Sequence, residues 1–159
     1  MITFGVTNRG KRRIKDYDLA NVDKYVNKLI EHFNLDKYEA DIDIEFVDRC
    51  DSDAGGYCFG DDEQIEIEIA KSVQGEKLDF ESMMVSLAHE MVHAKQLITH
   101  QLVDQGIQMS QLRGCTSMFK VSIWEGHTFI DTAYEDMPWE KEAYALEKGL
   151  YDAYKSVFI

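Results

Sequence analysis

The feature that most constrains this chain is a pair of histidines on an amphipathic helix. Between residues 79 and 97 the large apolar residues recur at helical spacing, namely Phe80, Met83, Met84, Leu87 and Met91. Asp79 is a favourable residue to cap the start of this helix. His89 and His93 are four residues apart, and side chains at this spacing lie on one helix face. The sequence therefore predicts a core-packed helix that presents two imidazoles side by side.

The segment from Ala88 to His93 reads Ala-His-Glu-Met-Val-His, which is an HExxH motif. Two imidazoles one turn apart can reach a single zinc ion at about 2.0–2.1 Å. Glu90 follows the first histidine and can take a proton from a zinc-bound water and pass it to a leaving amine. The motif predicts a catalytic zinc site with Glu90 as general base. The alternative interpretation is that both histidines are surface residues that bind nothing.

A catalytic zinc ion usually has three protein ligands and one open position, so a third ligand is needed. The candidates in this chain are Glu140, Glu142, His127, His100 and the cysteines. The two glutamates lie in the first turn of a helix that begins near Pro138, and such a helix could cross under the first one and present a carboxylate. The alternative for either glutamate is a solvated first-turn acid that is favoured by the helix dipole.

Hydrophobic periodicity predicts the remaining elements. An amphipathic helix is expected over residues 18–34, and strands are expected where isoleucine or phenylalanine alternates with acids, at residues 42–46 and 65–69. A strand over residues 119–124 and a short hairpin at 127–130 follow, whereas residues 99–116 are expected to be part helix and part loop. This order of elements is typical of an α+β fold rather than a regular βαβ fold.

The length and composition favour one domain that spans residues 1–159. A chain of 159 residues suits a single domain, and a domain of this size buries about 68–70% of its unfolded surface, so no disulfide is needed. Neither an internal repeat nor a Pro/Ser-rich linker divides the sequence. The predicted fold is therefore a small mixed or antiparallel sheet packed on the HExxH helix, with an N-terminal and a C-terminal helix.

The net charge of −13 disfavours nucleic acid as a partner, because this field repels phosphate backbones. The one basic cluster consists of Arg9, Lys11, Arg12, Arg13 and Lys15. Its simplest interpretation is a solvated N-terminal segment, and a contact to a small anion or nucleic acid is the alternative. No run of 18 apolar residues exists, so we expect no membrane span.

Three cysteines, at positions 50, 58 and 115, form no C-x-x-C pair, and an odd number fits poorly with a disulfide framework. We therefore expect buried thiols at Cys50 and Cys58 and a reducing, cytoplasmic location. The N-terminal residues lack the apolar region of a signal peptide, which agrees with that expectation.

The HExxH motif followed downstream by Glu-x-x-Ala resembles the gluzincin branch of the zincin metallopeptidases. The strings AHEMVHAKQ, WEGHTF and PWEKEAY are similar to those of small SprT-like or zincin-like metallopeptidases of phages and bacteria. The resemblance covers about residues 79–150. It implies a zincin-like minimal metallopeptidase fold and a Zn²⁺ cofactor.

Residue by residue, the resemblance implies that His89 and His93 are the paired ligands, Glu90 is the catalytic glutamate and Glu140 is the third ligand. Glu142 is the alternative, because an alanine also follows it by three residues. Tyr144 stands where gluzincins often have Asp, so the partner of the ligand histidine's second nitrogen is unassigned.

SprT-like proteases use a third histidine as a ligand, and His127, after Gly126, is the candidate for that role. His100 is too close to the end of the same helix to fold back easily. These proteases often carry a Cys-rich zinc finger for DNA, and this sequence contains nothing like it. Together with the charge, this disfavours a role in repairing DNA–protein crosslinks.

The sequence thus favours zinc-dependent hydrolysis of peptide bonds in a peptide or protein substrate. The alternative is a zincin-fold binding or regulatory protein without turnover, for example a phage protein that engages a host factor, and a metal-free acidic interaction protein is a third hypothesis. By the same resemblance, residues 64–70 are expected to form an edge strand that binds substrate, and a simple solvated edge strand is the alternative. Tyr134 or Tyr144 could stabilise the oxyanion. Neither the substrate sequence nor the oligomeric state follows from the chain.

Overall fold

The structure is a computed structural model that describes residues 1–159, the side chain at position 112 excepted. The α-helices are α1 (Asp16–His32), α2 (Phe80–Ile98) and α3 (Pro138–Tyr154), and the 3-10 helices are η1 (Leu35–Lys37), η2 (Tyr134–Asp136) and η3 (Lys155–Phe158). The strands are β1 (Ile2–Asn8), β2 (Ala40–Val47), β3 (Gly56–Gly60), β4 (Gln64–Ala70), β5 (Ser72–Val73), β6 (Glu76–Lys77), β7 (Leu102–Leu112), β8 (Cys115–Trp124) and β9 (His127–Ile130).

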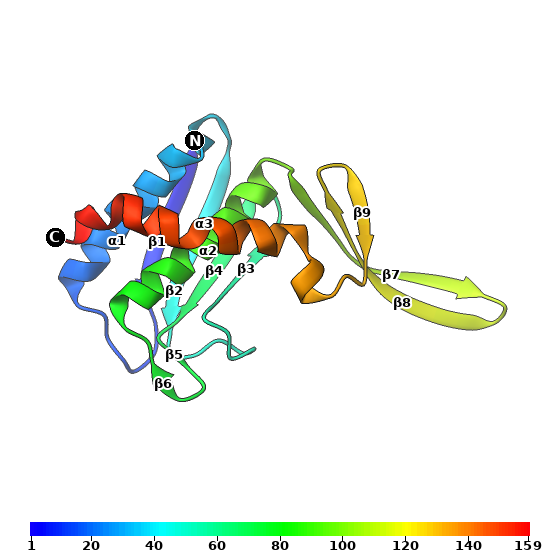
Figure 1. Cartoon of the computed structure of the whole chain (residues 1–159), viewed down its shortest axis with the longest axis horizontal. Coiled ribbons are helices and arrows are strands. Elements are labelled where there is room, and N and C mark those ends of the chain that lie inside the picture. Colours follow the sequence, from blue (N-terminus) through cyan, green and yellow to red (C-terminus); the bar gives the residue numbers. More distant parts are fainter.

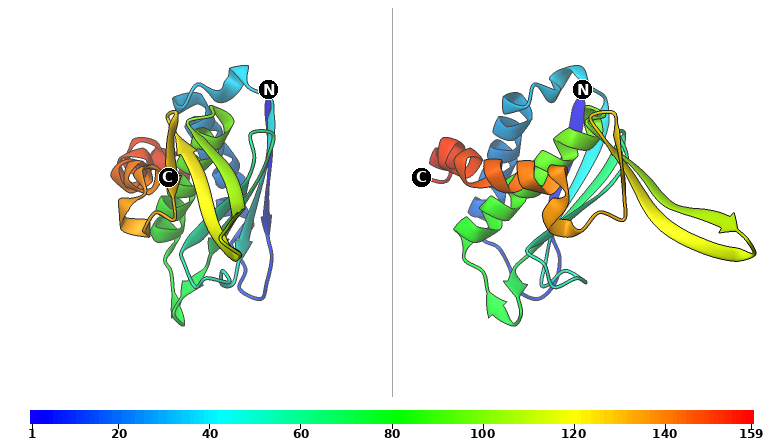
Figure 2. Two further views of the ribbon diagram at one scale, coloured as in Figure 1. Left: turned by 90° about the vertical axis from the view of Figure 1, so that its right-hand side faces the viewer. Right: turned by 45° about the vertical axis from the view of Figure 1, so that its right-hand side comes forward.

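The fold is α+β, as the sequence predicts, and its centre is a mixed four-stranded sheet. The strand order is β1-β2-β4-β3, in which β1, β2 and β4 are parallel and β3 runs antiparallel to β4. The helices lie on one face of this sheet, with α2 between the sheet and α3 (Figures 1 and 2). The isoleucines of β2 and β4 point into this core, whereas their acidic neighbours point to the uncovered face.

Strand β4 is not at the edge of the sheet. It pairs with β2 on one side and with β3 on the other, so the prediction that residues 64–70 form an edge strand is wrong. Outward-pointing side chains of β4 are charged because no helix covers that face of the sheet. They do not mark a free backbone edge. The two edge strands are β1 and β3, and β3 is the edge strand that lies beside the HExxH helix α2.

Helix α2 begins at the predicted cap. The side chain of Asp79 accepts a hydrogen bond of 2.7 Å from the backbone N–H of Ser82. Because the sheet packs on one side of α2 and α3 packs on the other, most of its residues from Met83 onward are buried, including His89 and His93. Ala143 of α3 is fully buried, and its small side chain allows α3 to lie close to α2.

Strands β7 and β8 form a long hairpin that projects from the rest of the molecule (Figures 1 and 2). The prediction of helix and loop over residues 99–116 is wrong, because β7 starts at Leu102. Away from its base the hairpin is exposed on both faces, so the usual alternation of buried and exposed residues is absent. Three large apolar residues of the hairpin are about 70% exposed, namely Ile107 at 70%, Met109 at 71% and Met118 at 69%.

The basic N-terminal segment is solvated except at Arg12. Its guanidinium donates hydrogen bonds to the backbone carbonyls of Lys71 and Leu78, so the interpretation of the whole cluster as solvated is wrong at this residue. The buried Lys71 ammonium in turn donates to Asn8 at 2.7 Å and forms an ion pair with Asp48 at 3.3 Å. These contacts fix the chain between β1 and α1 to the end of β4.

Within the described residues, no helix is both long and apolar enough to cross a membrane. The three cysteines are free thiols: Cys50 is buried, Cys58 is partly buried and Cys115 is exposed. The expectation of buried thiols is therefore met at Cys50 and only in part at Cys58.

Candidate metal centre

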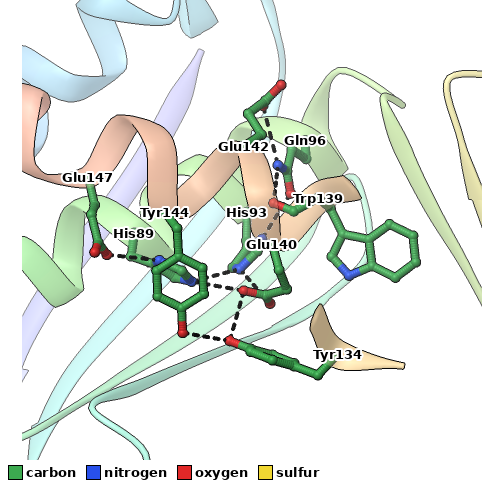
Figure 3. Close-up of polar contacts among 9 residues, drawn as sticks. All are labelled: His89, His93, Gln96, Tyr134, Trp139, Glu140, Glu142, Tyr144 and Glu147. Atoms are coloured by element: carbon green, nitrogen blue, oxygen red, sulfur yellow. Dashed lines mark hydrogen bonds and ion pairs between the residues drawn. The ribbon is translucent and has the colours of Figure 1, made fainter. Parts of the chain in front are cut away.

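Three side chains from two helices converge on one point (Figure 3). His89 and His93 come from the middle of α2, and Glu140 comes from the first turn of α3, which Pro138 begins. The Nε2 atoms of the two histidines are 3.2 Å apart. The Glu140 carboxylate lies 3.1 Å from His89 Nε2 and 3.0 Å from His93 Nε2. The structure thus brings together the two histidines of the motif and one of the two candidate glutamates.

The outward nitrogen of each histidine has its own acceptor. His89 Nδ1 is 3.0 Å from a carboxylate oxygen of Glu147, and His93 Nδ1 is 2.9 Å from Gln96 Oε1. The Gln96 amide nitrogen donates to the carbonyl of Trp139 at 3.0 Å, so its oxygen must face the histidine. Each Nδ1 therefore carries a proton and donates it, which leaves both Nε2 atoms as lone-pair donors.

Three lone-pair donors that face one another need a cation between them. Either a proton or a metal ion can meet this need, and donors that hold one tetrahedral zinc ion at about 2.0–2.1 Å are separated by roughly 3.3 Å. The observed separations of 3.0, 3.1 and 3.2 Å are close to that value. Two imidazoles and one carboxylate are also a ligand set of catalytic zinc sites. The residues present fit a metal ion.

The pKa shifts of His89, His93 and Glu140 show how these side chains behave when a proton, and not a metal ion, lies between them. Burial lowers the pKa of both histidines, but the hydrogen bonds to Glu140 and the nearby carboxylates outweigh this and raise it overall. For Glu140, burial acts to raise the pKa of the carboxyl, and the hydrogen bonds from His89 and His93 lower it well below its usual range. Glu140 is therefore a carboxylate at neutral pH.

Glu90 lies beside the three donors and not among them. Burial raises the pKa of its carboxyl to about 7, against the lowering effect of the two histidines. It packs against Gly56 of β3, where an added Cβ would lie 2.8 Å from Glu90 Oε1. A carboxyl with a pKa near neutrality can both accept and return a proton at physiological pH.

A cavity of about 520 Å³ gives access to the site from solvent. His89, His93, Glu90 and Glu140 all line it. Strand β3 forms one wall, with Cys58 among its lining residues, and the base of the β7–β8 hairpin forms another. Burial and the charges of Glu90 and Glu140 raise the pKa of the Cys58 thiol, so this side chain enters the cavity as a neutral group.

Two tyrosines complete the surroundings of the centre. The Tyr134 hydroxyl donates to Glu140 Oε2 at 3.0 Å and is 2.9 Å from the Tyr144 hydroxyl. The Tyr144 ring packs edge-on against the His89 ring, with the centroids 4.6 Å apart. Tyr134 lines the cavity and Tyr144 does not, so Tyr134 is the one of the two candidate oxyanion residues that can face a bound ligand. Burial, Tyr144 and Glu140 raise the pKa of Tyr134, which keeps it protonated.

The structure does not bring the other candidate ligands to this point. Glu142 lies beyond Gln96 (Figure 3). It also accepts hydrogen bonds from Lys95 at 3.1 Å and Gln101 at 2.9 Å. His127 is exposed on β9, and His100 Nε2 is hydrogen-bonded to Asp62 at 2.6 Å at the surface. Glu142 and His100 thus contact other side chains, and His127 lies at the surface of β9, so none of the three joins the two histidines of α2.

Sequence reasoning missed both acceptors of the outward histidine nitrogens. Glu147 follows Glu140 by two helical turns and so shares its face of α3, and Gln96 follows His93 by three residues on α2. Helical spacing could therefore have suggested each of them. Glu147, one helical turn after Tyr144, is the carboxylate that contacts His89 Nδ1.

Comparisons of the chain with family models, with curated proteins and with solved structures gave no match. The geometry of the centre and its cavity is therefore the basis on which a function can be assigned.

Proposed function

We propose that this protein is a zinc-dependent peptidase with a zincin-like fold, in which His89, His93 and Glu140 hold the ion. The observation that carries the proposal is the arrangement of hydrogen bonds around the three donors. Glu147 and Gln96 accept hydrogen bonds from the two Nδ1 atoms, so each neutral imidazole turns its Nε2 lone pair toward the Glu140 carboxylate. Histidine ligands of metal sites are commonly held in this tautomer by an acceptor on their other ring nitrogen.

A bound zinc ion would supply a Lewis acid that activates water and polarises a carbonyl group. The chain's own residues do the rest. Glu90 lines the cavity beside the donors, where it can accept a proton from the attacking water and return it to the departing amine nitrogen. The Tyr134 hydroxyl lines the same cavity, and by turning its proton away from Glu140 Oε2 it can donate a hydrogen bond to the oxygen that becomes negative during the attack.

The free edge of β3 supports a peptide as the substrate. An extended peptide can add to an exposed strand edge through backbone hydrogen bonds, and Gly56 to Gly60 form such an edge along the cavity wall. This strand takes the role that the sequence assigned to residues 64–70. A peptide bound there would lie along the cavity that Glu90 also lines.

Metal analysis and a peptide-hydrolysis assay test the proposal. After reconstitution and dialysis, the wild-type protein should hold one zinc ion per chain and hydrolyse unfolded protein. The Glu90→Gln variant should keep the zinc and lose about 10²- to 10⁴-fold in rate. Glu140→Gln should lose the zinc, whereas Glu142→Gln, with the same charge change two residues away, should keep it. A wild-type protein that binds less than stoichiometric zinc, or a Glu90→Gln variant of undiminished rate, would contradict the proposal.

The projecting hairpin favours a second candidate function, a zincin-fold binding protein without turnover. Ile107, Met109 and Met118 are large apolar side chains at an exposed position, which is typical of a contact surface. Under this alternative, metal-loaded protein would show no hydrolysis, and Glu90→Gln would behave as wild type in every binding assay. If the wild type hydrolyses peptides and the Glu90→Gln variant does not, this alternative is excluded.

A further inference from the structure

A second cavity lies on the other side of strand β3. It has a volume of about 510 Å³ and is lined by Cys50, Asp51, Ser52, Tyr57, Phe59 and Glu68. Ser52, Tyr57 and Phe59 also line the cavity of the metal centre, so the two cavities adjoin each other along the free edge of the sheet. Nothing in the proposed hydrolytic mechanism uses this second cavity.

Two aromatic side chains at this edge are exposed, and among the described residues their rings pair only with each other. Tyr57 is 51% exposed and Phe59 is 39% exposed, and their ring centroids are 5.2 Å apart on the face of the sheet that no helix covers. Aromatic faces that remain open to solvent beside carboxylates are a favourable environment for a cation.

The carboxylates of this cavity have no cationic partner. Glu68 is half-buried opposite Tyr57 in the register of β3 and β4, and among the described residues neither it nor Asp51 forms an ion pair. The neighbouring outer face carries further acids, including Asp43 and Glu66. The buried Cys50 reports the same field, because burial and then the charges of Glu68, Glu90 and Asp51 raise the pKa of its thiol to about 11.

The second cavity lies where side chains of an extended peptide bound to the edge of β3 would point. Successive side chains of a strand point to opposite faces of the sheet. In a peptide paired with the free edge of β3, one set of side chains points toward α2 and the metal centre, and the alternate set points toward Tyr57 and Phe59. We propose that the second cavity binds a lysine or arginine side chain from this alternate set, so that the substrates are extended peptides with cationic residues. This inference rests on the proposed peptidase function.

Glu68→Gln and Glu66→Gln form a matched pair for the test. Both remove one negative charge from the outer face of β4, but Glu68 lines the second cavity and Glu66 does not. The probes are a fluorescein-labelled octapeptide of alternating threonine and lysine and its counterpart with glutamine in place of lysine. Binding of each probe to the full-length protein is measured by fluorescence anisotropy, with and without zinc.

The wild-type protein should bind the lysine probe at least about fivefold more tightly than the glutamine probe. Glu68→Gln should remove most of this preference, and Glu66→Gln should retain it. Equal affinity for the two probes in the wild type would overturn the inference. An equal loss of preference in both variants would also overturn it, because the selectivity would then come from the overall charge of the face.

Cleavage of the two peptides by zinc-loaded protein separates this inference from the function on which it rests. Faster cleavage of the lysine probe supports both. Equal cleavage of both probes would contradict the cation site and leave the peptidase function intact. An intact binding preference without any cleavage would contradict the peptidase function and leave the preference for cationic peptides.

Discussion

Gly56 determines where the carboxylate of Glu90 can lie, although it belongs to another element. An added Cβ at this position would be 2.8 Å from Glu90 Oε1 and 3.0 Å from Glu90 Cγ, so the Glu90 side chain would have to move. Gly56→Ala should therefore reduce hydrolysis about tenfold or more, because small displacements of a general base are costly. Zinc content should be unchanged.

Steady-state hydrolysis and metal analysis of the same preparation measure both effects. Gly5→Ala is a suitable control, since no atom lies within 4 Å of a Cβ added in strand β1. Full activity in Gly56→Ala would show that Glu90 is not positioned by this contact.

Glu147 is expected to hold His89 in place for the metal without touching the metal itself. Loss of a carboxylate that accepts from a ligand histidine typically weakens metal binding about 10- to 100-fold. We expect this change in zinc affinity for Glu147→Gln, measured by competition with a chromophoric chelator. Glu142→Gln should leave the affinity within about twofold of wild type. If Glu147→Gln bound zinc as tightly as wild type, the 3.0 Å contact to His89 Nδ1 would have no role in metal binding.

At the residue scale the sequence predicts local features of the site better than distant ones. His89, Glu90 and His93 follow from a spacing within one helix. Glu140 and Glu142 are two residues apart and point to different sides of α3, so the choice between them depends on how α3 crosses α2. The two helices meet at a contact in which Ala143 is fully buried, and such a tertiary contact is not specified by the pattern of a single sequence.

The element that places the third donor is α3, and Ala143 sets its distance from α2. Ala143→Leu would insert three extra carbon atoms into a fully buried contact, which costs typically about 1–3 kcal/mol of folding stability. It should also move Glu140 away from the histidines and weaken zinc binding. Urea unfolding and zinc titration measure the two effects, and Ala145→Leu, at an exposed position of the same helix, is the control. Unchanged zinc affinity in Ala143→Leu would mean that α3 tolerates a larger separation.

Most elements with a buried and an exposed face are predicted from the sequence, namely helices α1, α2 and α3 and strands β2 and β4. Strand β1 is missed, although Ile2, Phe4 and Val6 alternate with smaller or polar residues and a signal for this strand exists in the sequence. Strand β7 lacks such a signal, because most of its length packs on nothing. Hydrophobic periodicity arises where one face of an element is buried, so an element that is not buried has no such pattern in its sequence.

The molecule as a whole is a compact body with one long projection. A compact domain of this length has a radius of gyration of about 15 Å. We expect small-angle X-ray scattering to give a clearly larger value, because the β7–β8 hairpin extends away from the body (Figure 2). Replacement of residues 105–120 by a two-residue turn should bring the value close to 15 Å and leave thermal stability within about 1 kcal/mol. An unchanged radius in the shortened protein would show that the hairpin folds back in solution.

The separation of the three donors along the chain has a consequence for motion. An ion held between α2 and α3 would join a segment from the middle of the sequence to one near its end, in the manner of a covalent cross-link. At a free zinc concentration 100 times the dissociation constant, about 2.7 kcal/mol would be added to the stability of the state in which α3 is docked. Chelation should therefore accelerate amide hydrogen exchange in α3 and leave the exchange of β1 and β2 nearly unchanged, as mass spectrometry of the two forms can show. In this sense the metal would regulate how firmly the C-terminal helix stays attached.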